Sequence, residues 1–189
     1  MAQKQNAKQR KQIVEAALSL AGKGGWAKLT FAAIAKKAKL KTGDIEKQFS
    51  DVWDILIAAL SDIEIRTQEK VENYLSDNWH DNLMEILMTR FDLAEAHRVA
   101  FSSLVRDIPR RPKVVRRLLP AFYGTMQRML ELSGAPAQPL TIVAFGGLYL
   151  SIVDTWIKDD SRDKSKTMAA IDKRLGLFES FSGYLSCKK

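Results

Sequence analysis

Residues 30–49 constrain the fold more than any other stretch, because they have the pattern of two short helices joined by a tight turn. The hydroxyl of Thr30 can accept a hydrogen bond from a free backbone N–H, as an N-cap residue does. Apolar side chains then recur on one helical face: Phe31, Ile34, Ala35 and Ala38. After a break near Lys39, a second helix begins at residue 41 or 42 and carries Ile45 and Phe49 inward. This arrangement predicts a helix-turn-helix, a motif that places its second helix in the major groove of DNA.

The outward face of this motif carries the side chains that we expect to contact DNA. They are Thr30, Lys39, Lys41, Thr42, Asp44, Lys47 and Gln48. Lysines neutralise phosphates, which gives affinity without sequence information, and they can also pair with guanine. Gln48 can form two hydrogen bonds with adenine, and Asp44 can accept one from N4 of cytosine. Thr30 and the free amides that follow it can hold a phosphate.

The distribution of charge agrees with this interpretation. The chain has 189 residues and a net charge of +8. Residues 1–50 contain 11 basic and 3 acidic residues, so they account for the whole net charge and the remainder is balanced. A basic module on a neutral body is typical of proteins that bind polyanions, although lysines at a surface can also serve solubility alone.

The same segment resembles the TetR family of bacterial transcriptional regulators. The matching positions follow an amphipathic helix at residues 8–22 and are Gly25, Trp26, Leu29, Thr30, Ile34, Ala35, Ala38, Leu40, Gly43, Ile45, Phe49, Ile55 and Leu56. Trp26 is expected to pack beneath the motif rather than to stack on a base. Three residues depart from the pattern: Lys39 replaces a usual Gly, Glu46 a usual phosphate-binding Tyr, and Val52 a usual Lys.

The rest of the chain has helical periodicity and no strand-like alternation. Helices are expected at about residues 8–23, 51–75, 79–97, 98–106, 112–132, 137–158 and 164–184, besides the two of the motif. Residues 1–7 are polar and are expected to fray. We therefore predict an all-α fold of about nine helices, with a three-helix DNA-binding domain at residues 1–50 and a helical bundle for ligand binding and dimerisation at residues 51–189.

Large, adaptable side chains gather in the predicted bundle. Those that could line an apolar ligand pocket are Met84, Met88, Phe91, Phe101, Phe122, Tyr123, Met126 and Tyr149. Four residues could provide polar anchors in it: Arg90, His97, Gln127 and Tyr149. Ordinary core packing is the competing interpretation for most of these side chains. Gly146 and Gly147, inside an expected helix, indicate a close approach of two helices.

Other classes of function lack support in the sequence. The two histidines, His80 and His97, have no metal-ligand spacing, and no nucleophile elbow, phosphate-binding loop or dinucleotide fingerprint is present. We therefore expect no enzyme activity, no cofactor and no metal. The lone Cys187 fits a reducing cytoplasm. The most apolar stretch, residues 140–157, contains Asp154 and two glycines, which favours a buried helix over a membrane span.

The resemblance implies a cytoplasmic bacterial regulator, which we interpret as a repressor. It would pair through its last two helices as a homodimer, bind a palindromic double-stranded DNA operator, and release it on binding a small hydrophobic effector. A second interpretation stays open. Residues 156–175 resemble the end of TetR-fold lipid-binding proteins of ubiquinone biosynthesis, and Glu46 and Val52 fit a chain with degenerate DNA binding.

Overall fold

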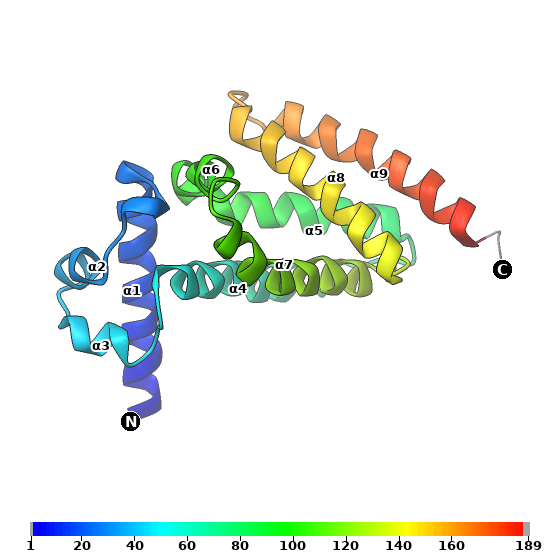
Figure 1. The fold of residues 1–189 in the computed structure, drawn as a ribbon. Coiled ribbons are helices and arrows are strands. Elements are labelled where there is room, and N and C mark those ends of the chain that lie inside the picture. Colours follow the sequence, from blue (N-terminus) through cyan, green and yellow to red (C-terminus); the bar gives the residue numbers. More distant parts are fainter. Residues whose placement is uncertain (1, 187–189) are drawn as a thin grey trace. The chain divides into compact units, whose positions relative to one another are not determined.

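The computed structural model describes residues 2–186, with side chains placed from residue 5 to residue 183. Within that range the chain forms nine α-helices, two 3-10 helices and no β-strand. Figure 1 labels the α-helices and colours the ribbon along the sequence. The predicted all-α fold of about nine helices is confirmed. Cys187, the basis of the argument about redox compartment, lies outside the described residues.

The helices divide into two compact units, each made of two segments of the chain. Unit 1 contains the residues up to Ile63 together with Ala94–Arg116, and unit 2 contains Glu64–Leu93 together with the residues from Arg117 onward. Helices α4 (Val52–Val71) and α7 (Pro112–Ser133) therefore each contribute to both units. The predicted division at residue 50 falls inside unit 1, which also includes a later segment that the sequence did not associate with it.

Unit 1 begins with α1 (Ala2–Gly24), η1 (Trp26–Lys28), α2 (Phe31–Ala38) and α3 (Thr42–Glu46), and it continues with η2 (Glu95–His97) and α6 (Arg98–Asp107). Ile13, Ala16 and Ala17 of α1 are buried, as their spacing predicts. The expectation that residues 1–7 fray was wrong for residues 2–7, because α1 already begins at Ala2. This segment contains no Gly or Pro, and its Ala, Gln and Lys residues favour a helix.

Trp26 of unit 1 is completely buried, which confirms its predicted structural role. Its Nε1 donates to the carbonyl oxygen of Ala100 in α6 at 3.0 Å, and its ring stacks on Trp53 with centroids 6.5 Å apart. Gly25 precedes it with φ 82°, and a Cβ there would lie 3.0 Å from Oδ2 of Asp107. Both the backbone conformation and the close approach therefore require glycine at this position.

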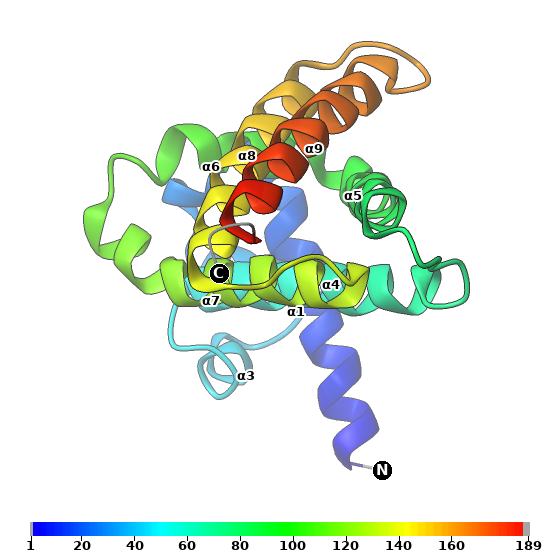
Figure 2. The same ribbon diagram turned by 90° about the vertical axis from the view of Figure 1, so that its right-hand side faces the viewer.

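Unit 2 contains α5 (Trp79–Ala94), α8 (Pro139–Lys158) and α9 (Ser165–Ser186), with the later parts of α4 and α7. Figures 1 and 2 both show α8 and α9 side by side. Arg174 of α9 joins them, since its Nε donates to Ser151 Oγ at 2.6 Å and its Nη2 to Thr155 Oγ1 at 3.3 Å. The buried core of the unit includes Leu83, Ile86, Leu87, Phe91, Met129, Leu130, Phe145, Trp156, Ile171, Leu175 and Phe178.

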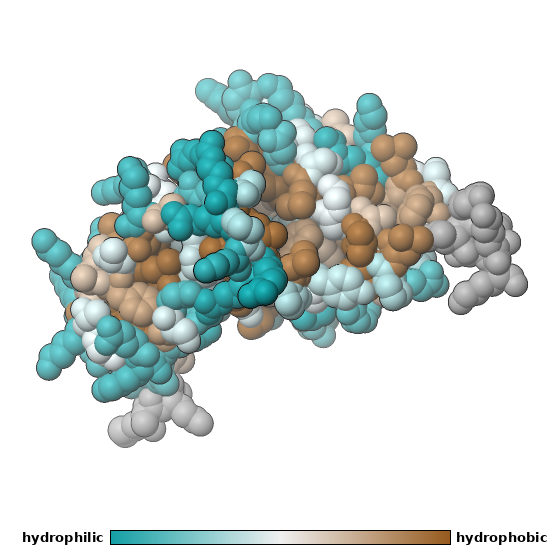
Figure 3. Space-filling view, in the orientation of Figure 1, coloured by the Kyte–Doolittle hydropathy of each residue, from teal (hydrophilic) through white to brown (hydrophobic). Residues whose placement is uncertain are grey.

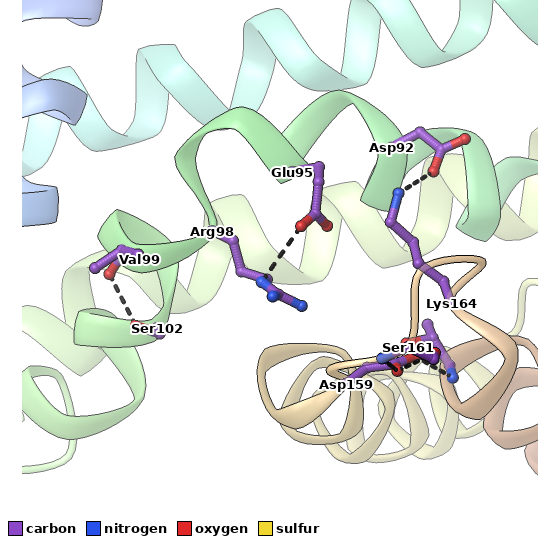
Figure 4. A network of polar contacts seen from close by, with 9 residues as sticks. Asp92, Glu95, Arg98, Val99, Ser102, Asp159, Ser161 and Lys164 are labelled. Carbon is purple, nitrogen blue, oxygen red and sulfur yellow. Dashed lines mark hydrogen bonds and ion pairs between the residues drawn. The ribbon is translucent and has the colours of Figure 1, made fainter.

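The connection between α8 and α9 is held by a buried carboxylate. Asp159 accepts from the backbone N–H and the hydroxyl of Thr167 at 2.8 and 2.6 Å, and from the backbone N–H of Ser161 at 3.0 Å. Figure 4 shows Asp159 beside Ser161, and Lys164 of the same loop paired with Asp92 of α5. Burial raises the pKa of Asp159, but the hydrogen bonds from Ser161 and Thr167 outweigh it and hold the pKa well below the usual range.

Two expected helices end earlier than their apolar period suggests. Helix α4 ends at Val71 instead of residue 75, and the connection to the next helix is held by the buried amide of Asn82. This amide donates to the carbonyl oxygens of Ser76 and Ser133 at 2.8 and 3.0 Å, and accepts from the Ser76 N–H at 2.8 Å. Helix α5 ends at Ala94, where the expected helix 79–97 changes into the 3-10 turn η2.

Candidate nucleic-acid interface

Helices α2 and α3 form the predicted helix-turn-helix. Thr30 is the N-cap of α2, and its hydroxyl accepts from the Ala33 N–H at 3.2 Å. The turn is closed by Lys39, which has left-handed backbone angles of φ 57° and ψ 41°, and by the Leu40 N–H, which donates to the Ala35 carbonyl at 3.0 Å. The TetR family, which this segment resembles, usually has Gly at this position. Here Lys39 has to adopt a backbone conformation for which glycine is preferred.

Helix α3 is shorter than predicted and ends at Glu46 instead of residue 49. Its first turn is closed by Asp44, whose carboxylate accepts from the Lys41 N–H at 3.4 Å. Gln48, just beyond the helix, donates from Nε2 to the Asp44 carbonyl at 3.3 Å. Two of the predicted base-reading side chains therefore also stabilise the backbone of the motif. Beneath them, Ile45 and Phe49 are buried, as predicted.

The predicted contact residues differ in exposure. Thr30, Lys39, Lys41 and Lys47 are exposed, as are Lys36, Lys37 and Glu46, whereas Thr42, Asp44 and Gln48 are half-buried. The motif thus presents lysine side chains to solvent around α3, and Glu46 is its exposed carboxylate. Such a surface can neutralise phosphates, since lysine is a mobile point charge.

Arg10 of α1 is a further basic residue beside the motif that the sequence reasoning missed. Its guanidinium lies over the ring of Phe49, 4.8 Å from the centroid, although its side chain is exposed. Arg10 belongs to a helix distant from the motif in sequence. Only the packing of α1 against Phe49 brings it there, so no local pattern could have indicated it.

The predicted pocket residues separate into two groups. Phe101 is buried in unit 1, whereas the other seven belong to unit 2. In unit 2, Tyr149 of α8 stacks on Phe91 of α5 with centroids 6.1 Å apart and lies at the same distance from Phe122 of α7. A Cβ on Gly146 would lie 3.1 Å from Phe122 and 3.7 Å from Met126, which confirms a close approach of α7 and α8 at this glycine. Met84, Met88 and Tyr123 are half-buried.

The four residues expected as polar anchors do not lie together in one site. His97 lies in unit 1 and pairs with Glu15 at 3.4 Å, while Gln127 donates to Glu131 at 2.8 Å on an exposed helix face. Arg90 is 4% exposed, and its Nε donates to the hydroxyl of Tyr149 at 3.0 Å. Arg90 and Tyr149 are therefore the two anchors that the structure brings together, next to Phe91 and Phe122.

The apolar stretch at 140–157 is buried on one side only, so its assignment as a buried helix holds for one face of α8. Leu140, Val143 and Leu150 are 56%, 63% and 56% exposed. Figure 3 shows hydrophobic surface where α8 and α9 lie in Figure 1. Helix α8 is long and apolar enough to cross a membrane, but core helices of soluble proteins also meet these criteria of length and composition.

Among the residues whose side chains are described, no group of three His, Cys, Asp or Glu side chains could hold a metal ion.

The sequence matches no model of a protein family, and no curated protein is significantly similar to it. The fold, however, is that of TetR-family transcriptional regulators. A TetR regulator from Nitrosomonas europaea superposes with a TM-score of 0.75 at 17% identity, over 90% of this chain and 97% of that one. A TetR regulator from a Rhodococcus species has a TM-score of 0.60 at 14% identity, over 93% and 98% of the two chains.

A third similar structure is the transcriptional regulator FadR from Bacillus subtilis, solved in complex with stearoyl-CoA. It has a TM-score of 0.60 at 20% identity, over 89% of this chain and 96% of that chain. These identities are low, so the likeness concerns the fold alone.

Proposed function

We propose that this protein is a cytoplasmic bacterial transcriptional regulator that binds double-stranded DNA through α2 and α3 and acts as a repressor. Residues 1–50 would bind DNA, and residues 51–189 would bind a ligand and dimerise. The observation that carries the proposal is the helix-turn-helix with Lys39, Lys41 and Lys47 exposed around α3, in a chain whose net positive charge lies entirely in residues 1–50. The TetR-type fold supports it.

Each predicted side chain has a role in this proposal. Lys39, Lys41 and Lys47 neutralise phosphates, and Thr30 with the amides that follow it holds a further phosphate. Thr42, Asp44 and Gln48 lie close to the bases and select among sequences. Asp44 and Gln48 are restrained by their bonds to the motif's own backbone, which reduces the entropy lost on binding.

Dimerisation is supported by the exposed face of α8. Leu140, Val143 and Leu150 are separated by three and seven residues, the spacing of a seam between packed helices. Met168 and Leu177 of the adjacent α9 are 48% and 59% exposed. We propose a second copy of this chain as the occupant, since a two-fold pairing buries the same stripe on both protomers and presents two motifs to a palindromic operator.

A small hydrophobic effector would regulate the protein by binding unit 2. The aromatic cluster of Phe91, Phe122 and Tyr149 supports an apolar ligand, and the similar FadR structure with stearoyl-CoA supports the same class. Such a ligand alters DNA binding only to the extent that it binds one conformation more tightly than another.

Selection from random double-stranded DNA tests the proposal. We expect one enriched palindromic sequence, bound at least ~10³-fold more tightly than random DNA. Lys41→Ala and Lys47→Ala should weaken binding and lower the salt dependence, whereas Lys173→Ala, an exposed lysine of α9, serves as the control and should not. An unenriched pool, with both motif variants behaving like the wild type, would favour the TetR-fold lipid-binding alternative. The exposed carboxylate of Glu46 and the replacement of a usual Lys by Val52 support that alternative.

A further inference from the structure

Arg90 is a buried positive charge with one end of its guanidinium unpaired. The residue is 4% exposed, and its guanidinium group is a planar cation with five N–H donors. Its Nε donates to the Tyr149 hydroxyl at 3.0 Å, but its buried Nη1 has no hydrogen-bond partner within the described part of the chain. Buried charged donors are normally satisfied, and one that is not indicates a functional constraint or an absent partner.

Glu64 interacts electrostatically with Arg90, but its carboxylate is already hydrogen-bonded to other residues. Burial raises the pKa of Glu64, but hydrogen bonds from Arg128 and Thr125 outweigh it and lower the pKa, with smaller contributions from the charges of Arg128 and Arg90. Arg128 donates to both carboxylate oxygens, and Thr125 Oγ1 donates to Oε2 at 2.8 Å. Glu64 thus joins α4 to α7 and does not hydrogen-bond to Nη1 of Arg90.

The surroundings of Arg90 are aromatic. Tyr149 stacks on Phe91 at an interplanar angle of 11° and lies beside Phe122, and Phe91 in turn contacts Trp156 with centroids 5.2 Å apart. Because the Tyr149 oxygen accepts the bond from Arg90, its own hydrogen can be donated to a second group. Two donors, Arg90 Nη1 and the Tyr149 hydroxyl, therefore belong to one aromatic cluster built from α5, α7 and α8.

We propose that Arg90 Nη1 and the Tyr149 hydroxyl bind the carboxylate of an amphipathic acid whose apolar body packs against Phe91 and Phe122. A carboxylate has two acceptor oxygens for these two donors and cancels the buried charge, which an uncharged apolar molecule cannot do. The chemical class of the effector is thereby restricted from apolar molecules in general to carboxylic acids with an apolar body. The regulatory role of this ligand rests on the proposed function, whereas its binding does not.

Calorimetric titration of the full-length protein, stripped of co-purified lipid under native conditions, tests the binding. The probes are decanoate, 4-phenylbutanoate and 2-naphthoate, each compared with its own primary amide, which has nearly the same shape and no charge. At least one carboxylate should bind about tenfold or more tightly than its amide. Arg90→Met should abolish this preference, and Arg162→Met, an exposed arginine of the α8–α9 loop, should keep it.

Two further measurements separate binding from structure. Arg90→Met should melt at the wild-type temperature or above, because it removes a buried charged group whose Nη1 has no hydrogen-bond partner, whereas the loss of an arginine with only a structural role would lower the melting temperature. Tyr149→Phe keeps the ring and loses the hydroxyl, so it should reduce the preference even if Arg90→Met does not fold. If no carboxylate binds more tightly than its amide, or if the preference survives in Arg90→Met, the proposal is wrong. DNA release by the acid is measured separately, so a failure of operator binding leaves this result intact.

Discussion

Lys39 shows how one residue can hold a turn at a cost to stability. It adopts φ 57° and ψ 41°, and its N–H donates to the carbonyl of Lys36 at 3.4 Å. In this region the Cβ of an L-residue crowds the following carbonyl oxygen, and glycine avoids the conflict. Keeping a lysine there is consistent with a role for its charge at the proposed DNA surface.

We therefore expect Lys39→Gly to raise the free energy of unfolding by about 1 kcal/mol, measured by urea denaturation. Lys37→Gly is the matched control, since Lys37 is exposed within α2, and there glycine should lower the same quantity by about 1 kcal/mol. Two losses of similar size would show that Lys39 is not strained.

Asp159 should make the stability of unit 2 depend on acidic pH. Because its pKa is lowered in the folded protein, its contribution is fully present above about pH 5 and is lost as the pH falls below the ordinary carboxyl range near 4. Asp159→Asn should cost about 2 kcal/mol at neutral pH, through weakened bonds to Thr167 and Ser161. The difference from the wild type should shrink on acidification, as measured by denaturation at several pH values. Asp62→Asn, on the exposed face of α4, should change stability by less than about 0.5 kcal/mol at every pH.

Lys41 and Lys47 flank α3, and the helix itself carries one exposed acidic side chain, so the effect of this negative charge on DNA binding can be tested. Glu46 lies in the last turn of α3, next to Lys47. Glu46→Gln should strengthen DNA binding several-fold, because it removes a negative charge that repels the phosphates. Glu46→Tyr should strengthen binding further, because the tyrosine hydroxyl can donate a hydrogen bond to a phosphate oxygen. Fluorescence anisotropy with the selected operator measures both variants. Glu72→Gln, an exposed residue just beyond α4, is the control and should leave affinity unchanged. Unchanged binding in both Glu46 variants would mean that this position does not face DNA.

At the level of elements, the sequence predicted most helices because their buried faces repeat with the helical period. Helices α7 and α8 begin or end within two residues of the expected positions, where Pro112, Gly134 and Pro139 interrupt the chain. Periodicity could not locate the ends that tertiary contacts determine. The connection that follows α4 is held by Asn82, whose partner Ser133 is distant in sequence, and α1 extends over polar residues that carry no apolar signal.

The candidate sites divide in the same way. The cap at Thr30 and the inward Ile45 follow from local spacing and were predicted. The position of Arg10 over Phe49 and the bond from Arg90 to Tyr149 depend on helices that meet only after folding. Sequence alone named Arg90 and Tyr149 as candidate anchors, but it could not indicate that these two pair while His97 and Gln127 take other partners.

For the whole molecule, the separation of charge and apolar surface is the property that the proposed function uses. The net positive charge lies in residues 1–50, whereas the exposed apolar stripe of α8 belongs to unit 2. If the lysines lay on α8, they would repel each other in the proposed dimer interface. If the apolar stripe lay on the motif, it would face DNA. In the proposed dimer the two surfaces would therefore act in one molecule, and each protomer would supply one motif.

The stripe predicts that the dimer can be broken at defined positions. Val143→Glu and Leu150→Glu each place a charge on a side chain that is more than half exposed, so the fold of the protomer should be retained. Burying a Val or Leu contributes about 1.5–3 kcal/mol, and a two-fold interface contains every position twice. Each variant should therefore raise the dimer dissociation constant at least about 100-fold, as measured by sedimentation equilibrium. Val105→Glu, on an exposed apolar residue of α6 in unit 1, should remain dimeric. A wild type that sediments as a monomer at micromolar concentration would exclude the dimer, and variants that stay dimeric would exclude α8 as its interface.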